Sequence, residues 1–214
     1  MSWDARAEAY RTSPTHRAGA DLDALVEWCE PAPGIGVLDV ATGGGHVGRR
    51  LAEAGCRVTT ADASPGMQPD VVCAAESLPF ADRSFDVVAC RIAAHHFDDV
   101  AAAVREMARV TRRLVVIEDT LYADEQVEEA ERLRDPTHVR CYSEEEWKEM
   151  LTEAGLEVEQ LEHFERHPVV ADWLARVDTP AADAARVCEL LADHVEDGVL
   201  TLKSIVVKAR RSQK

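Results

Sequence analysis

The architecture of the chain follows from one stretch, Val37-Leu38-Asp39-Val40-Ala41-Thr42-Gly43-Gly44-Gly45-His46-Val47-Gly48. A short apolar run ends there, the chain turns through three consecutive glycines, and a helix is expected to follow. Glycine lets the backbone adopt left-handed conformations and approach a ligand closely. Open α/β sheets bind their ligands beyond the carboxyl ends of the strands. The stretch therefore predicts a strand, a ligand-binding turn and a helix in succession.

Apolar runs on both sides of this stretch predict further strands, and helical patterns separate them. The expected strands are residues 36–40, 57–61, 71–74, 85–90, 114–117, 156–164 and 201–209. The expected helices are residues 21–30, 47–54, a segment starting near 98, 123–134, a segment capped by Ser143 and Glu146 that ends at 155, and 171–196. We therefore expect an α/β fold with a Rossmann-like, doubly wound, mostly parallel seven-stranded sheet and an antiparallel edge strand near the C-terminus. Residues 1–214 are expected to form a single domain.

Composition excludes several classes of function. The formal net charge of -16 would repel nucleic acid and anionic lipid, so neither is an expected partner. Six scattered cysteines contain no Cys-x-x-Cys pair, which favours reduced thiols in a cytoplasmic protein and predicts no metal site. No apolar run reaches the roughly 18 residues of a membrane span. The oligomeric state, monomer or homodimer, stays open.

Two interpretations of the glycine turn compete. Gly43-x-Gly45-x-x-Gly48, with Asp62 on the order of 20 residues later, satisfies the dinucleotide-binding pattern of NAD(P)-dependent oxidoreductases. That site would hold a pyrophosphate, which a carboxylate at Asp39 would repel by nearly 3 kcal/mol at roughly 6 Å and an effective dielectric constant of about 20. S-adenosylmethionine carries an ammonium and a sulfonium group and no phosphate. Asp39 therefore favours S-adenosylmethionine.

The same stretch resembles motif I of the class I S-adenosylmethionine-dependent methyltransferases, particularly the small-molecule branch that includes the enzymes of ubiquinone and menaquinone biosynthesis. Further motifs of that family follow in the right order. They are Ala61-Asp62-Ala63-Ser64-Pro65-Gly66-Met67, Ala75-Glu76-Ser77-Leu78-Pro79-Phe80, Phe85-Asp86-Val87-Val88-Ala89-Cys90-Arg91 and Ala94-His95-His96-Phe97. Together they cover roughly residues 37 to 97.

The resemblance implies a set of cofactor-binding residues. The methionine part of the cofactor would be surrounded by Asp39, Ala41, Gly43 and Gly45, and Arg91 would close the site near the methyl group. Asp62 would accept hydrogen bonds from both ribose hydroxyls. The adenine would be held by Ala63, Met67, the backbone at Ala75, and Glu76.

Departures from the family pattern accompany this match. The aspartate usual in the adenine loop is replaced by Ala74, the connection over residues 64–70 is too short and too rich in proline for a proper helix, and Thr111-Arg112-Arg113 replaces the usual Pro-Gly-Gly.

Candidate catalytic and substrate residues lie elsewhere in the chain. His95 and His96 follow a strand directly and are candidate general bases, although they could instead cap the next helix. His16, His138 and Arg140 are candidate substrate-binding residues, with surface ion pairs as the alternative for the last two. Residues 1–20 suit a lid or N-terminal arm, and residues 121–142 suit a substrate-side insertion. The acidic pair at 118–119 is expected to be a solvated turn.

We therefore expect methyl transfer from S-adenosylmethionine to a small-molecule acceptor with an O, N or C nucleophile, leaving S-adenosylhomocysteine. Two alternatives remain open at this point. One is an NAD(P)-dependent oxidoreductase, and the other is a non-catalytic partner protein that binds S-adenosylmethionine.

Overall fold

A single seven-stranded sheet forms the centre of the protein in the computed structural model, which describes residues 3–212. Its strands, in the order in which they pair, are β3 (Val71–Val72), β2 (Arg57–Asp62), β1 (Gly36–Val40), β4 (Phe85–Arg91), β5 (Thr111–Thr120), β9 (Leu202–Arg211) and β6 (Leu156–Arg166). The first five run parallel, and β9 runs antiparallel to both of its neighbours. The two central parallel strands, β1 and β4, lie at the point where the strand order reverses.

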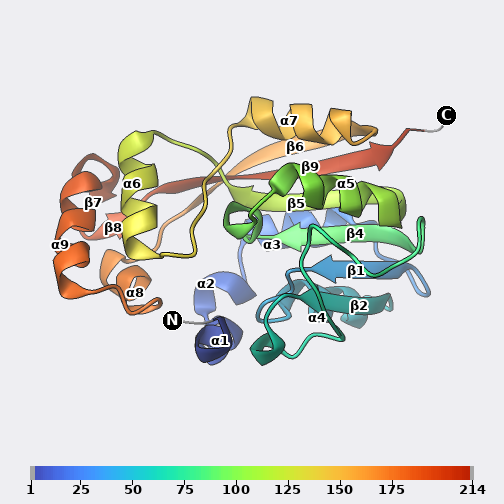
Figure 1. Cartoon of the computed structure of the whole chain (residues 1–214), viewed down its shortest axis with the longest axis horizontal. Coiled ribbons are helices and arrows are strands. Elements are labelled where there is room, and N and C mark those ends of the chain that lie inside the picture. Colours follow the sequence, from blue (N-terminus) through green and yellow to red (C-terminus); the bar gives the residue numbers. More distant parts are fainter. Residues whose placement is uncertain (1–2, 213–214) are drawn as a thin grey trace.

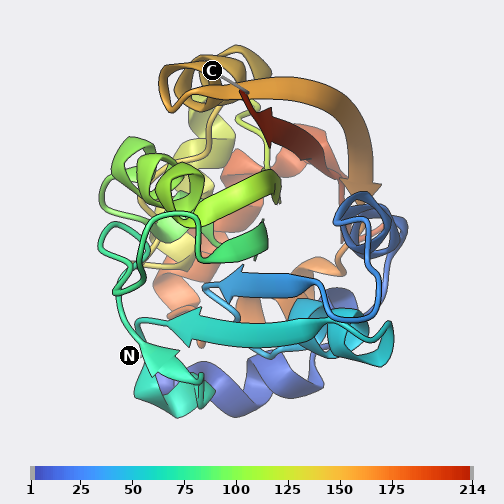
Figure 2. The same cartoon turned by 90° about the vertical axis from the view of Figure 1, so that its right-hand side faces the viewer.

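Helices cover both faces of this sheet (Figure 2). One face carries α5 (Val100–Val110) and α7 (Glu144–Glu153), and the other carries α3 (Ala20–Trp28) and α4 (His46–Glu53). Successive strand residues point to opposite faces. Accordingly, Val87 of β4 packs in the core cluster with α3, whereas Val88 packs in the cluster with α5. Burial on both faces explains why the strands read as continuous apolar runs.

A small cap lies beyond the carboxyl ends of the parallel strands, on the left of Figure 1. It consists of α6 (Glu125–Arg134), α8 (Val170–Ala175), α9 (Ala181–Leu190) and the two-stranded sheet of β7 (Val195–Glu196) and β8 (Val199–Leu200). Its own apolar cluster includes Trp173, Val187 and Leu200. Helices α1 (Trp3–Thr12) and α2 (Pro14–Arg17) lie at the same end of the sheet. Three single turns of 3₁₀ helix complete the elements of residues 3–212: η1 (Pro65–Met67), η2 (Ala94–His96) and η3 (Ala192–His194).

The expected fold class is confirmed. β1 has the expected bounds, and the Ser143–Glu146 capping box that starts α7 is present in both directions. The antiparallel strand near the C-terminus is β9, which lies one position in from the edge because β6 pairs with its outer side. Within residues 3–212, no helix is both long and apolar enough to cross a membrane.

Several segments differ from expectation. β5 spans Thr111–Thr120 where 114–117 was expected, and β3 spans Val71–Val72 where 71–74 was expected. The helix expected over 171–196 is interrupted between α8 and α9, where Asp178 adopts a left-handed φ angle of 53° and Pro180 precedes the first residue of α9. Beyond α9, Asp197 and Gly198 adopt left-handed φ angles of 50° and 77° and form the turn of the β7–β8 hairpin. The N-terminal arm is helical rather than irregular. Of the proposed lid, residues 1 and 2 lie outside the described range.

Candidate active site

The glycine turn after β1 is held by the carboxylate of Asp39. Its Oδ2 accepts hydrogen bonds from Thr42 Oγ1 at 2.6 Å and from Gly48 N at 3.0 Å. A side chain at Gly48 would bring its Cβ within 3.1 Å of this oxygen, so glycine is what lets α4 approach the strand. The turn contains three residues with left-handed φ angles: Ala41 (52°), Gly43 (50°) and Gly45 (72°). These angles give the backbone its tight bend between β1 and α4. Strain at Ala41 shows how closely the turn is specified.

A second carboxylate, Asp62, ends β2 on the other side of this turn. Its Oδ2 accepts from Gly43 N and its Oδ1 accepts from Ser64 N, each at 2.9 Å. A carboxylate has about four acceptor sites, so two remain for a ligand. These two free acceptor sites fit two neighbouring hydroxyl groups that donate, as in a ribose.

These residues border a cavity of about 240 Å³ at the carboxyl edge of β1, β2 and β4. The structure brings most of the expected site residues together on its walls. They are Asp39, Ala41, Gly43, Asp62, Ala63, Met67, Ala75, Glu76, Arg91, His16 and His96. The remaining expected residues, Gly45, His95, His138 and Arg140, are not among those that line it.

The cavity floor is negatively charged. Burial raises the pKa of Asp39 to about 6, against the opposing effect of its two hydrogen bonds, so the carboxyl is still mainly ionised at pH 7. Burial also raises the pKa of Asp62. Burial lowers the pKa of His46, and it lowers that of His16 well below the usual value with help from neighbouring arginines, so both rings are neutral. The ionised carboxylates and neutral histidine rings suit a cationic ligand and oppose a pyrophosphate.

The N-terminal helix α1 contributes two aromatic walls, Trp3 and Tyr10, that were not among the expected site residues. The aromatic ring of Tyr10 is part of the reason that residues 1–20 suit a lid. The helix is anchored to the loop after β2 by Asp4, whose Oδ1 accepts from Ser64 Oγ at 2.5 Å and Gly66 N at 2.7 Å. A Cβ at Gly66 would lie 2.5 Å from the Cα of Asp4, so only glycine admits this contact.

A buried ion pair ties the same helix to the cap side. Arg6 Nη1 contacts both carboxylate oxygens of Asp135, at 2.8 and 2.9 Å, and both side chains are almost completely buried. Sequence patterns contain no signal for this pairing because its partners are 129 residues apart.

Arg91 lines the cavity and contacts three protein partners, and its Nε meets Glu118 as an ion pair without hydrogen-bond geometry. It pairs with Asp21 of α3 and, through Nε at 2.8 Å, with Glu118 of β5, and it donates to the carbonyl of His16. The expectation that residues 118–119 form a solvated turn is wrong, because β5 extends to Thr120 and both carboxylates are at most 1% exposed. Burial raises the pKa of Glu118 to about 7, although Arg91 opposes that rise.

His95 forms a buried pair with the second of these carboxylates. Its Nδ1 donates to Asp119 Oδ1 at 2.5 Å, and its backbone N donates to Oδ2 at 2.8 Å. Burial lowers the pKa of His95, but the charge and hydrogen bond of Asp119 outweigh burial and raise it overall. The pair holds η2, and hence the neighbouring His96, against β5.

His96 reaches the cavity from this turn. Its Nδ1 lies 3.0 Å from the carbonyl oxygen of Thr137, to which it donates, and this leaves Nε2 as the acceptor atom of the ring. Burial and the adjacent His95 lower its pKa, so the ring is neutral. The indole of Trp3 meets it edge-on, with ring centroids 4.8 Å apart.

His138 and Arg140 are engaged outside the cavity. His138 is buried against Glu128, and Arg140 pairs with Glu146 while lying over the ring of Tyr142. Arg140 therefore forms a surface ion pair, which was the alternative to a substrate contact, whereas the ion pair of His138 is buried.

Replacing Asp119 with asparagine is expected to lower stability most at acidic pH. The raised pKa of His95 stabilises the fold fully at pH values below about 6.5, and this stabilisation is lost as the pH rises through the raised pKa. The lowered pKa of Asp119 stabilises the fold at pH values above about 3.8. Without the carboxylate, burial is the largest remaining effect on the pKa of His95 and lowers it, so acid should destabilise the variant. Urea unfolding at about pH 5.5 should give a loss of roughly 3 kcal/mol that shrinks by about 1 kcal/mol or more towards pH 9. An equal loss at both pH values would contradict the ion pair.

Comparisons with known proteins add to this geometry. A family described as a methyltransferase domain matches residues 38–116. The chain is 33% identical over 198 residues to YcgJ, an uncharacterized methyltransferase of Bacillus subtilis, and the match covers 82% of this chain and 78% of the relative. The crystal structure of the YcgJ protein is similar, with a TM-score of 0.82 at 28% identity over 91% of this chain and 99% of that one. A demethylmenaquinone methyltransferase of Corynebacterium urealyticum is 42% identical over 89 residues, which covers 38% of this chain and 39% of the relative.

Proposed function

The chain belongs to the class I S-adenosylmethionine-dependent methyltransferases, and from that premise we propose that its cavity binds S-adenosylmethionine and presents the methyl group to a small-molecule acceptor. The observation that carries this proposal is the pair of carboxylates, Asp39 and Asp62, on either side of the glycine turn. One supplies negative charge near a sulfonium, and the other retains acceptor sites for ribose hydroxyls. The dinucleotide alternative loses support because the same charges oppose a pyrophosphate.

The chain's own residues supply alignment and a route for one proton. When bound, S-adenosylmethionine supplies an activated methyl group for in-line displacement, so positioning and exclusion of water provide much of the rate. Helix α1 covers the cavity with Trp3 and Tyr10. Near its N-terminus, Asp4 binds the backbone N of Gly66 and Arg6 pairs with Asp135, and near its C-terminus Arg11 Nη1 donates to the carbonyl of Gly66 at 3.0 Å. We assign residues 1–20 the role of a lid on that basis. Residues 121–142 would form the acceptor side, because Thr137 holds His96 there.

His96 is the general base in this proposal. Its neutral ring has the proton on Nδ1, fixed by Thr137, so Nε2 is free to accept. The lowered pKa makes the ring a weak base, so Nε2 takes the proton of an acceptor O–H or N–H only as that group becomes strongly acidic while the new bond to the methyl carbon forms. His95 is a positioning residue, because it does not line the cavity and acts through its bond to Asp119.

His96→Ala is expected to reduce kcat by about 100-fold while S-adenosylmethionine affinity changes little, since general-base catalysis typically contributes that much or more. His163→Ala is the matched control, because His163 is exposed on β6 and remote from the cavity. Steady-state rates of S-adenosylhomocysteine release, paired with calorimetric titration of each variant, measure the two quantities separately. A matching fall in cofactor affinity would argue that His96 is instead part of the cofactor site.

The proposed reaction is tested by supplying S-adenosylmethionine with small hydroquinones, phenols, amines and carbon nucleophiles and detecting S-adenosylhomocysteine and methylated product. Hydroquinones are included because relatives named demethylmenaquinone methyltransferase share 37–42% identity with part of the chain. Turnover with any acceptor supports the proposal. Tight cofactor binding without turnover across all four classes would favour the non-catalytic alternative.

A further inference from the structure

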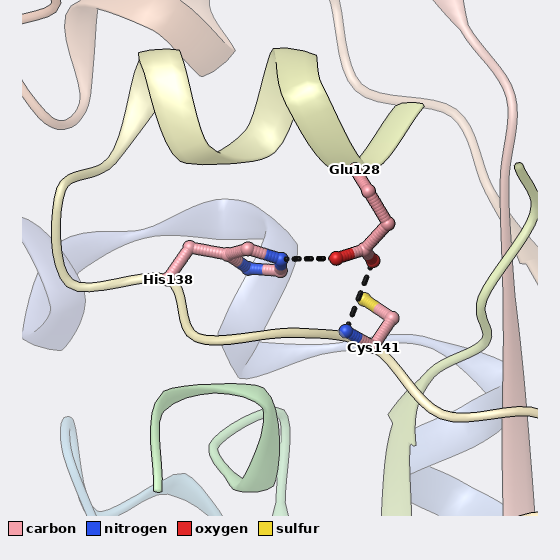
Figure 3. Close-up of side chains that lie close together, drawn as sticks. All are labelled: Glu128, His138 and Cys141. Carbon is pink, nitrogen blue, oxygen red and sulfur yellow. Dashed lines mark hydrogen bonds and ion pairs between the residues drawn. The ribbon is translucent and has the colours of Figure 1, made fainter. Parts of the chain in front are cut away.

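Three buried side chains outside the cavity converge on one point between α6 and the loop that follows it (Figure 3). They are Glu128 of α6, and His138 and Cys141 of the loop. A carboxylate oxygen, an imidazole nitrogen and the thiol sulfur all lie within 4.8 Å of one another. The side chains of Glu128 and His138 are 2% and 1% exposed, and Cys141 is 3% exposed.

The arrangement of the atoms matches what a metal ion requires. His138 Nε2 faces Glu128 Oε2 at 3.2 Å, and Cys141 Sγ points to the same carboxylate (Figure 3). The second oxygen of this carboxylate, Glu128 Oε1, is fixed by a hydrogen bond that it accepts from the backbone N of Cys141 at 3.0 Å. Neighbouring ligands in a tetrahedral site with bonds of about 2.0–2.3 Å are separated by roughly this spacing.

We propose that Glu128, His138 and Cys141 bind a divalent transition-metal ion of the zinc class. The mixed nitrogen, oxygen and sulfur set suits zinc, a borderline-soft ion that accepts all three ligand types. A thiolate and a carboxylate together neutralise the ion's two positive charges in this buried place. Three protein ligands leave the fourth position to water.

An adjacent charge bears on the site. Arg132 Nη2 lies 3.3 Å from Glu128 Oε2, where it competes with an ion, but its side chain is 50% exposed and can turn towards solvent. The sequence pattern predicted no metal because it contains no Cys-x-x-Cys pair, whereas these ligands come from a helix and a loop that only the fold brings together.

The site would brace the acceptor side of the cavity. The loop it fastens to α6 contains Thr137, which holds His96, and Val139, whose backbone N donates to the carbonyl of His95 at 2.9 Å. None of the three ligands lines the cavity. Metal binding and cofactor binding therefore use different residues, and each can be measured without the other.

Cobalt titration tests this site directly. The full chain, reduced and stripped with a chelator, is titrated with Co²⁺ while its absorption spectrum is recorded. We expect one Co²⁺ per chain, a thiolate-to-cobalt charge-transfer band, and loss of the band when Zn²⁺ displaces cobalt. Cys141→Ser should abolish the band, and Cys188→Ser, which changes an exposed thiol, should keep it.

Two further results keep the test decisive. If Cys141→Ser does not fold, Glu128→Gln preserves the shape and an acceptor for the Cys141 N–H, and it should weaken Zn²⁺ binding by about 10-fold or more. The melting temperature of the unmodified chain should also rise with free Zn²⁺. Absence of the band from the unmodified chain, or its persistence in a folded Cys141→Ser variant, would overturn the proposal.

Discussion

Asp62→Ala is expected to weaken S-adenosylmethionine binding by about 100-fold or more. Hydrogen bonds to a charged group contribute roughly 1.5–3 kcal/mol each, and the carboxylate would make two with the ribose hydroxyls, so about 3 kcal/mol or more is lost. The substitution also frees Gly43 N and Ser64 N, which Asp62 holds at the cavity wall. Calorimetric titration of the purified variant measures the change.

Asp70→Ala provides the matched control for this prediction. Asp70 is an exposed carboxylate at the same end of the chain's second strand, and it accepts from Thr60 N at 2.8 Å without lining the cavity. Its loss should leave affinity within about 2-fold, because no ligand contact is removed. If the Asp62 and Asp70 variants bound S-adenosylmethionine with equal affinity, Asp62 would not be part of the cofactor site.

Arg91→Met is expected to lower the free energy of unfolding by about 3 kcal/mol. Removing one partner of a buried ion pair typically costs 3–5 kcal/mol, and here it strands both Asp21 and Glu118. The lower end is expected because the raised pKa of Glu118 lets that carboxyl take up a proton. For a chain of this size the melting temperature should fall by about 6–12 °C.

Two variants check the cause of that loss. Arg113→Met breaks a partly exposed pair with Glu30 and should cost less than about 1 kcal/mol. Adding Glu118→Gln to Arg91→Met should recover part of the stability, because one buried charge is removed with its partner. Urea unfolding that gives Arg91→Met and Arg113→Met the same cost would show that the buried network is not stabilising.

The cofactor side of the cavity is predictable from sequence because its parts lie close together in the chain. Asp39 holds Thr42 and Gly48, which are three and nine residues away. Asp62 follows the next strand, and parallel pairing of Val40 with Ala61 brings it to the same edge. Periodicity and glycine placement are enough to specify such a unit.

The acceptor side depends on contacts between distant segments. The apolar residues of α1 do not gather clearly on one face of the helix. Its position depends on the hydrogen bond from Gly66 N to Asp4 and on the ion pair between Arg6 and Asp135. The prediction that Asp119 lies in a solvated turn is wrong, because an acidic pair after an apolar run is also typical of a turn. Pairing of β5 with β9 as far as Thr120 places Asp119 inside the sheet, beside His95.

The central claim is that this cavity accepts S-adenosylmethionine. Calorimetric titration of the unmodified chain with S-adenosylmethionine, S-adenosylhomocysteine and NAD tests it most directly. We predict saturable binding of the first two at one molecule per chain and no binding of NAD. Binding of NAD without either sulfur-containing ligand would contradict the account.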